Sequence, residues 1–173
     1  MKALTLTQPY ATLIAIGEKR IETRSWKTSY RGKLALHAAK GFGKGGKFEF
    51  LCTCGKEPFE SVLTRHTEAV IAKGIDTFQL AKILPFGAIV ATCDLVAIKR
   101  IGFDELSFPD GENFYINKTI ANIWYLNDQE RAFGDYNPGR YAWLLANVKK
   151  LETPIPTKGA LGLWDWNEEG LRQ

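Results

Sequence analysis

Short apolar stretches of strand length, separated by turn residues, run along most of this chain. Lys2 to Thr7 alternates apolar and polar side chains, which is the pattern of a half-buried strand. The longest apolar stretch, Phe86 to Ile101, predicts a central pair of strands or one long bent strand. Further strands are predicted at about Ile21 to Arg24, Lys33 to Ala39, Arg140 to Glu152 and Gly162 to Asn167, the last two separated by a proline-rich turn. We expect all of these strands to join one barrel-like sheet, because their apolar positions have no other shared core to enter.

Two segments have helical character. Pro9 opens a short helix through Ile16 that Gly17 ends, and Glu57 to Lys73 places apolar side chains at helical spacing. Strands and helices do not alternate in a repeating pattern, which argues for a closed or nearly closed β-barrel with inserted helices. The predicted fold class is therefore α+β and mainly β.

The length of 173 residues predicts a single domain over residues 1–173. Glycines and lysines between Gly41 and Lys47 predict a flexible basic loop around residues 40–56. A polar stretch broken by proline and glycine predicts an irregular insertion around residues 104–139.

Composition and charge set limits on the class of partner. The net charge of +4 is mildly basic, which is compatible with a polyanionic partner but does not prove one. No apolar run approaches the about 20 residues that span a bilayer, and the first residues run straight into the first strand, leaving no room for a secretory leader. We therefore expect a cytoplasmic protein with no membrane partner.

Three cysteines, Cys52, Cys54 and Cys93, are an odd number and fit a reducing compartment better than a disulfide framework. Cys52 and Cys54 with His66 match no common zinc spacing and lack a fourth ligand. We expect plain thiols, with no metal and no cofactor.

The segment from Gly17 to Trp26 compresses opposite charges into a turn and the strand that follows. Side chains alternate in a strand, so Glu22 and Arg24 share one face, and Lys19 can reach that face from the turn. One interpretation is a solvated ion pair of little energetic weight. The other is a site in which the lysine carries a proton or holds an anion and the glutamate acts as a base.

Gly17, Lys19, Glu22 and Arg24 resemble the G-x-K-x-x-E-x-R signature of the ASCH domain family, relatives of the PUA domain of many RNA-modifying proteins. The resemblance extends over Leu6–Ala11, Arg31–Ala39, Phe86–Thr92, Tyr141–Trp143, Pro154–Gly159 and Gly162–Trp164. It implies a PUA-like (ASCH) β-barrel with flanking and inserted helices, and a role linked to RNA.

The resemblance also implies a possible activity. Some small members of the family are amidohydrolases that remove an acetyl group from N4-acetylcytidine with a lysine, a threonine and a glutamate. Lys19 stands where that lysine does, but the family threonine falls at Glu22. Thr23 lies one place further on, which would point it to the opposite face of the strand.

Other residues fit a nucleic-acid ligand. Gln8, Pro9 and Tyr10 lie where a strand meets a helix, so a phosphate could bind at the start of the helix. Gln8 would then contact the edge of a base, and Tyr10 or Trp26 would stack on its face. The alternative is an ordinary helix start in which Tyr10 covers the core. Lysines mix with aromatic side chains in the basic loop, as in proteins that bind single strands; they are Lys40, Lys44, Lys47 and Lys56 with Phe42, Phe48 and Phe50.

Other residues in or near the predicted strands have structural or ligand-binding interpretations. Lys158 on a tight loop is a phosphate contact or a solvent-exposed side chain. His37, in an apolar strand, is expected to be a hydrogen-bonded core residue. Tyr141, Trp143, Trp164 and Trp166 are expected in the barrel core, and one or two could form the floor of a base-sized pocket.

Two functional hypotheses follow. The first is a module that binds RNA or a nucleotide in a charged cleft built on Lys19, Glu22 and Arg24. In this hypothesis Tyr10 or Trp26 stacks on a base, and the phosphate contacts are Lys19, Arg24, Lys158 and the basic loop with Lys44 and Lys47. The alternative is a small hydrolase of modified nucleosides or RNA, resembling the N4-acetylcytidine amidohydrolases or a ribonuclease, with Lys19 as acid/base and Glu22 as its partner.

Overall fold

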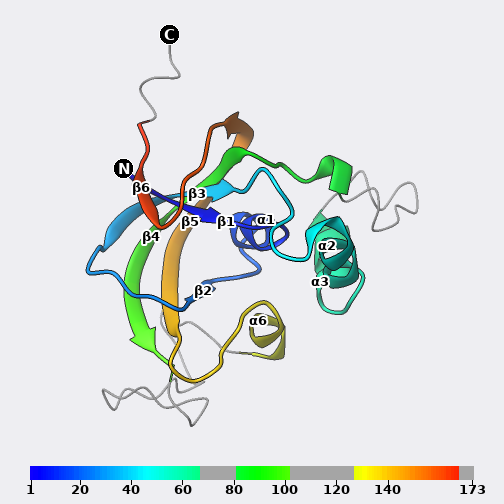
Figure 1. Cartoon of the computed structure of the whole chain (residues 1–173), viewed down its shortest axis with the longest axis horizontal. Helices are drawn as coiled ribbons and strands as arrows, with labels where there is room; N and C mark the ends of the chain where they lie inside the picture. Colours follow the sequence, from blue (N-terminus) through cyan, green and yellow to red (C-terminus); the bar gives the residue numbers. More distant parts are fainter. Residues whose placement is uncertain (67–80, 102–126, 168–173) are drawn as a thin grey trace. The chain divides into compact units, whose positions relative to one another are not determined.

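The computed structural model describes residues 1–66, 81–101 and 127–167 (Figure 1). The elements in chain order are β1 (Lys2–Leu6), α1 (Tyr10–Ala15), β2 (Ile21–Arg24), β3 (Gly32–Ala38), α2 (Gly46–Cys54), α3 (Phe59–His66), β4 (Ala88–Arg100), α6 (Asp128–Ala132), β5 (Tyr141–Pro156) and β6 (Leu163–Asp165). The strands form one six-stranded sheet in the order β2-β5-β4-β3-β1-β6. The prediction that they share one sheet is therefore confirmed.

The chain divides into two compact units. The first contains Met1–Glu18, Lys33–Cys93 and Val148–Gln173, and the second contains Lys19–Gly32 and Asp94–Asn147. Strands β4 and β5 each begin in one unit and end in the other. That residues 1–173 act as a single domain stays a prediction.

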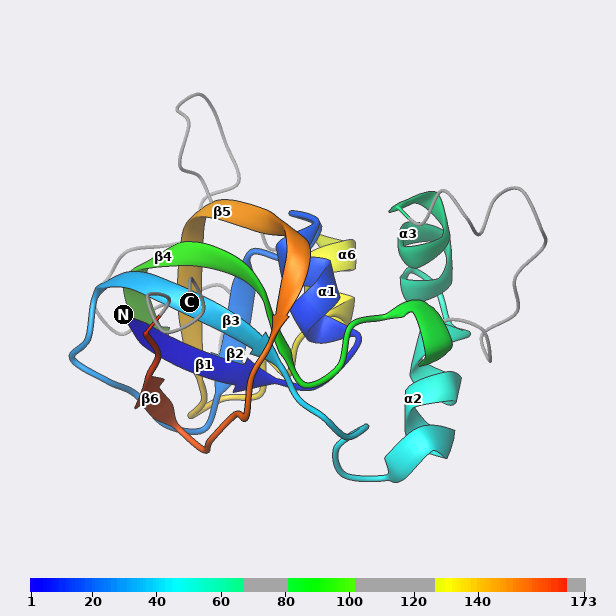
Figure 2. The ribbon, with the colours of Figure 1, turned by 90° about the horizontal axis from the view of Figure 1, so that it is seen from above.

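In the first unit β1 is the central strand of three. It pairs parallel with β3, where Leu4 lies opposite Leu36, and antiparallel with β6, where Ala3 lies opposite Trp164 (Figure 2). Both faces of β3 are buried over Leu34–Ala38. A hydrophobic core joins Ala3 to residues of β3, β4 and the end of β6; its buried members are Ala3, Ala35, Ile89 and Trp166.

The short helix α1 ends where the sequence predicts. Gly17 adopts a φ of +83°, a left-handed conformation that glycine takes without steric cost, and its N–H donates to the carbonyl of Ile14 at 2.9 Å. The chain can therefore leave the helix in a tight turn that leads directly to Lys19.

In the second unit β2 pairs antiparallel with the start of β5. Ile21 lies opposite Leu144 and Arg24 opposite Tyr141. Ile21 and Leu144 belong to a hydrophobic core together with Ile101 and Ala142. This pairing fixes the direction of the β2 side chains.

Three sequence-based predictions about elements differ in part from the described structure. The flexible loop expected around 40–56 contains helix α2, in which Phe50 and Cys54 are buried one turn apart. The irregular region expected around 104–139 contains helix α6, which begins at the cap residue Asn127; residues 102–126 lie outside the described part of the chain. The expected proline-rich turn after Glu152 belongs to β5, which continues to Pro156 because a strand tolerates proline where no ladder N–H is needed.

Two further predictions can be compared with the described residues. Of the two alternatives for Phe86–Ile101, one long strand is observed, β4. The helix expected over Glu57–Lys73 is confirmed for α3, and residues 67–73 lie outside the described part of the chain.

Candidate functional site

The charged residues of the turn and β2 do form a cluster in the second unit. The Nε of Arg24 lies 3.0 Å from Oε1 of Glu22, as alternation along a strand requires. The Nζ of Lys19 lies 3.9 Å from Oε2 of Glu22 and donates a hydrogen bond to the carbonyl of Ile21. We call Lys19, Glu22, Arg24 and Glu130 the lysine cluster.

Glu130, on α6, is a member of the lysine cluster that sequence reasoning missed. Its Oε1 lies 3.7 Å from Nζ of Lys19, and its two oxygens accept from the backbone N–H groups of Arg20 at 2.8 Å and Ile21 at 3.1 Å. The hydroxyl of Tyr136 donates to the same carboxylate at 3.4 Å. Glu130 therefore holds both the lysine and the backbone that leads into β2.

The lysine cluster is closed around its amine. Only 1% of the Lys19 side chain is exposed, against 25% for Arg24. Burial lowers the pKa of Lys19, although the carboxylates of Glu22 and Glu130 oppose that shift. Burial likewise raises the pKa of Glu130, opposed by Lys19 and by the N–H groups it accepts from. A phosphate cannot touch the amine in this arrangement.

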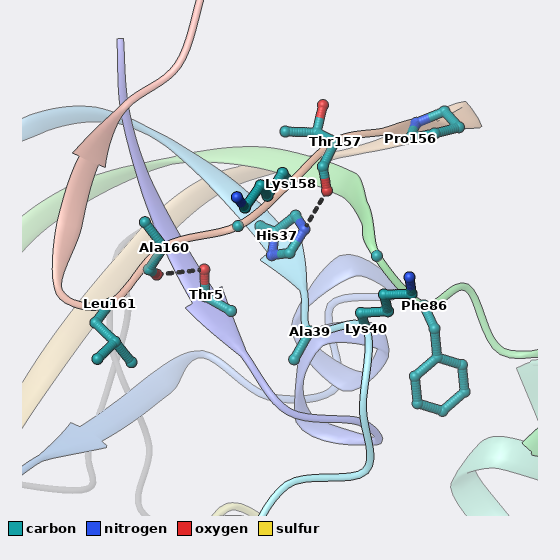
Figure 3. A pocket seen from close by; sticks show the side chains of 12 residues that line it. Thr5, His37, Ala39, Lys40, Phe86, Pro156, Thr157, Lys158, Ala160 and Leu161 are labelled. Atoms are coloured by element: carbon teal, nitrogen blue, oxygen red, sulfur yellow. Dashed lines mark hydrogen bonds between the residues drawn. The ribbon is translucent and has the colours of Figure 1, made fainter.

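The first unit contains a separate cavity of about 790 Å³, shown in Figure 3. His37 of β3 lies in its wall, and residues 156–161, which lead from the end of β5 toward β6, run along it. The side chains of Lys40 and Lys158 line the cavity and are exposed to solvent. We call this cavity the His37 pocket.

Three hydrogen bonds hold the connection between β5 and β6 over the His37 pocket. The N–H of Thr157 donates to the carbonyl of Gly87 at 2.9 Å. Nε2 of His37 donates to the carbonyl of Thr157 at 2.9 Å, and the hydroxyl of Thr5 donates to the carbonyl of Ala160 at 2.9 Å (Figure 3). Between these two points lies Gly159. A Cβ on Gly159 would lie 2.4 Å from Cε1 of His37, so only glycine allows the backbone to pass this close to the ring.

The ASCH domain family model matches residues 4–155. The chain belongs to the ASCH domain family. This match confirms the predicted fold class, a mainly β ASCH fold with flanking and inserted helices, and ASCH domains are a family thought to bind RNA.

Two solved structures similar to this chain are an ASCH protein of Zymomonas mobilis and a tyrosine-to-phenylalanine mutant of an ASCH protein from the same organism. Each is 12% identical with a TM-score of 0.47 and covers 97% of this chain; the alignments cover 88% and 91% of the respective Zymomonas chains. The comparison with curated proteins found no match.

Within this ASCH domain, the residues around the start of α1 are engaged with the protein itself. Gln8 is 2% exposed; its Nε2 donates to the carbonyl of Pro85 at 2.6 Å and its Oε1 accepts from the N–H of Thr12 at 3.1 Å. Pro9 precedes the helix, and Tyr10 packs edge-to-face on Phe59, with ring centroids 5.9 Å apart.

The predicted aromatic residues lie mostly in the core of the ASCH domain. Trp143 and Trp166 are buried, and Tyr141 and Trp164 are half-buried. Trp26 packs edge-to-face on Trp143, with centroids 4.7 Å apart, and its carbonyl accepts from the indole N–H of that residue at 3.2 Å.

The predicted phosphate contacts Lys44, Lys47 and Lys158 are all exposed. Lys47 lies in the first turn of α2, not in a loop. The aromatic rings of this region face the protein instead, since Phe42, Phe50 and Phe86 have centroids 5.0 to 6.0 Å apart. The structure therefore separates the cations from two of the three phenylalanines that the sequence placed with them.

Within residues 1–66, 81–101 and 127–167, no three His, Cys, Asp or Glu side chains gather as a metal ion would require. The three cysteines are free, and burial raises the pKa of Cys54 to about 12. In the same part of the chain, no helix combines the length and the apolar character of a bilayer-spanning segment.

Proposed function

We propose that this ASCH domain binds RNA or a nucleotide in the His37 pocket, with Lys40 and Lys158 on phosphate. The observation that carries the proposal is the combination of a cavity of about 790 Å³ with two exposed lysines in its lining. Small-molecule pockets commonly enclose about 300–1,000 Å³, and amines placed at the rim of an apolar cavity suit an anionic ligand.

Lys44 and Lys47 extend the positive surface of the same unit. Both are exposed, so they can neutralise further phosphates of a longer strand without rearrangement. The lysine cluster has a different role in this proposal. Because Lys19 is buried between carboxylates, it positions the turn and β2 and does not touch phosphate.

The experiment measures binding of a short single-stranded RNA as a function of salt concentration. Replacing Lys40 and Lys158 together with alanine removes two phosphate contacts, so we expect affinity to fall about tenfold for all sequences and the slope of log affinity against log salt to decrease by about 1.4. The matched control replaces Lys27 and Lys149, two exposed lysines that do not line the pocket, and removes the same charge. Equal losses in both double variants would show that the pocket is not the site.

The alternative function, hydrolysis of a modified nucleoside or of RNA, has one supporting observation. Lys19 is a buried amine with a lowered pKa beside Glu22, and such lysines can act as acids or bases. Incubating the same RNAs and N4-acetylcytidine with the wild type, Lys19→Arg and Glu22→Gln tests it. Turnover lost in both variants while each stays folded would establish it, and intact substrates throughout would exclude these reactions.

A further inference from the structure

The ring of His37 carries an unused hydrogen-bonding atom at the His37 pocket. Its Nε2 lies 2.9 Å from the carbonyl oxygen of Thr157, and a carbonyl only accepts, so Nε2 carries the proton. Burial lowers the pKa of His37, which favours the neutral ring. In a neutral ring with a protonated Nε2, Nδ1 is a lone-pair acceptor.

No described residue donates to this acceptor. Nδ1 is buried and has no hydrogen-bond partner, and His37 as a whole is only 1% exposed. Buried polar atoms are nearly always paired, and an unpaired one costs about 1–3 kcal/mol. An acceptor left unpaired in the wall of a cavity is therefore a candidate for pairing with a ligand.

The backbone of Lys158 and Gly159 lies next to Nδ1 in the wall of the pocket. Gly159 covers the ring so closely that a Cβ there would lie 2.5 Å from Nδ1. The anchoring hydrogen bonds are made by Thr157 and Ala160, on either side, while Lys158 and Gly159 make no hydrogen bond within the described part of the chain. A ligand can reach the buried Nδ1 only if these two residues shift, and neither of them makes an anchoring hydrogen bond.

The chemistry of the ligand follows from the charged and polar groups that line the pocket. Lys40 and Lys158 favour an anion, and Nδ1 of His37 requires an N–H or O–H donor. A nucleotide has both, since its phosphate is anionic and its base carries amino or imino N–H groups. The nearby Leu161, whose exposed fraction is 97%, adds an apolar side chain to the lining on which a base can pack.

We propose that His37 is the base-reading residue of the pocket, where Nδ1 accepts a hydrogen bond from an N–H group of the nucleobase. This inference rests on the proposed function, because it assumes that a nucleotide occupies the His37 pocket. It goes further by naming the atom that contacts the base and the kind of group that the base must present.

The first experiment titrates the protein with the four ribonucleoside monophosphates and with ribose 5-phosphate, which has the phosphate but no base. Trp164, whose ring centroid lies 5.7 Å from that of His37, supplies a fluorescence signal. We expect His37→Phe to weaken at least one nucleotide about tenfold more than it weakens ribose 5-phosphate. The variant releases the carbonyl of Thr157 for every ligand, but only a base loses its contact with Nδ1. His66→Phe is the matched control, since His66 is the other histidine of the chain and contacts Glu18 away from the pocket.

Analogues that differ by one amino group test the same contact from the ligand side. Purine riboside monophosphate lacks the amino group of AMP, and the corresponding 2-pyrimidinone nucleotide lacks that of CMP. If an amino group meets His37, the wild type prefers the parent nucleotide and His37→Phe does not. If the base presents an imino group instead, the loss in His37→Phe appears with UMP or GMP.

A measurement on the wild type tests the same contact even if the His37→Phe variant does not fold. With two histidines in the chain, a ¹⁵N spectrum resolves the ring nitrogens of each. Nucleotide binding is expected to shift the Nδ1 resonance of His37 and not that of His66. An unmoved Nδ1, with nucleotide affinities unchanged in His37→Phe, overturns this inference alone. The proposed function fails separately if neither RNA, nucleotides nor ribose 5-phosphate bind the wild type.

Discussion

At the scale of single residues, Lys19 and Glu130 form the contact that most distinguishes the lysine cluster from a surface ion pair. The side chains are 1% and 6% exposed, so each charge is compensated by the other and by neighbouring protein groups, not by water. Ion pairs of this kind are not strongly stabilising in themselves, but removing one partner leaves a buried charge uncompensated. Replacing Lys19 or Glu130 alone should therefore reduce the free energy of unfolding more, relative to the number of substitutions, than replacing both together.

We predict that Lys19→Met lowers the free energy of unfolding by about 3 kcal/mol, and that Glu130→Gln has an effect of similar size. The double variant should lose less than the sum of the single losses, because it leaves no uncompensated partner in that pair. Urea denaturation followed by tryptophan fluorescence measures all three. Lys27→Met, at an exposed lysine, is the control and should stay within about 0.5 kcal/mol of the wild type. Additive losses would mean that the pair is not coupled.

The residues of the lysine cluster differ in how far the sequence could predict them. Glu22 and Arg24 are two positions apart in a strand, so local alternation was enough to pair them. Glu130 lies 110 residues beyond Arg20, whose N–H it accepts, and no local pattern connects such positions. The one local signal is Asn127, whose side chain caps α6 by accepting from the N–H of Glu130 at 2.7 Å.

His37, too, could be predicted from the sequence only in part. Its role as a hydrogen-bonded core residue was predicted from the apolar strand around it and is confirmed by the bond to Thr157. Its place in a pocket was not predicted, because Thr157 comes 120 residues later in the chain. Sequence reasoning proposed Lys158 as a phosphate contact but had no means to place it beside His37.

At the scale of elements, α2 is the clearest difference between prediction and structure. The glycines before α2 and at its first residue indicated a flexible loop, and three of them, Gly43, Gly45 and Gly46, do take left-handed conformations. The helix that follows is held by packing rather than by propensity, since Phe50 contacts the rings of Phe42 and Phe86. Such tertiary packing is not visible in a short sequence window.

We predict that Phe50→Ala lowers the free energy of unfolding by about 3 kcal/mol or more, the usual cost of truncating a buried phenylalanine. Phe48→Ala is the matched control, because Phe48 lies two positions away in the same helix with 76% of its surface exposed. It should change stability by no more than about 0.5 kcal/mol. Chemical denaturation of both variants under identical conditions measures the difference. Equal, small effects would restore the flexible-loop interpretation of this segment.

At the scale of the whole molecule, the sequence predicted that the strands share one sheet but not their order. Strand β1 pairs with β3, which follows shortly after it, and also with β6 from the far end of the chain. The second of these pairings depends on contacts between residues far apart in the chain, such as the ion pair between Lys2 and Asp165 at 2.9 Å, 163 positions apart. Strand order of this kind is decided by long-range packing, which periodicity does not report.

The two candidate sites fall in different units. The lysine cluster belongs to the second unit, whereas His37, Lys40 and Lys158 belong to the first. A substitution in the lysine cluster therefore removes no residue that lines the His37 pocket. For this reason the stability of each variant has to be measured alongside its affinity for RNA.

Acid sensitivity is the last prediction, and it concerns the stability of the folded chain. Burial lowers the pKa of His37 in the folded state, whereas an unfolded histidine binds its proton near pH 6.5. As the pH falls below about 6.5, the unfolded state therefore binds this proton first, and the free energy of unfolding decreases. Above about pH 7.5 the ring is neutral in both states and contributes no pH dependence.

The test compares the wild type with His37→Phe by urea denaturation between about pH 8 and pH 5, the window that brackets the unfolded histidine. We expect the wild type to lose more stability on acidification than the variant, with a difference in slope of at most about 1.4 kcal/mol per pH unit, the limit for one proton. Glu130 contributes with the opposite sign, because its raised pKa lets the folded state bind a proton first. Glu130 is present in both proteins, so its contribution cancels in the comparison. Parallel curves for the two proteins would mean that the buried ring of His37 titrates in the folded state as it does in the unfolded chain.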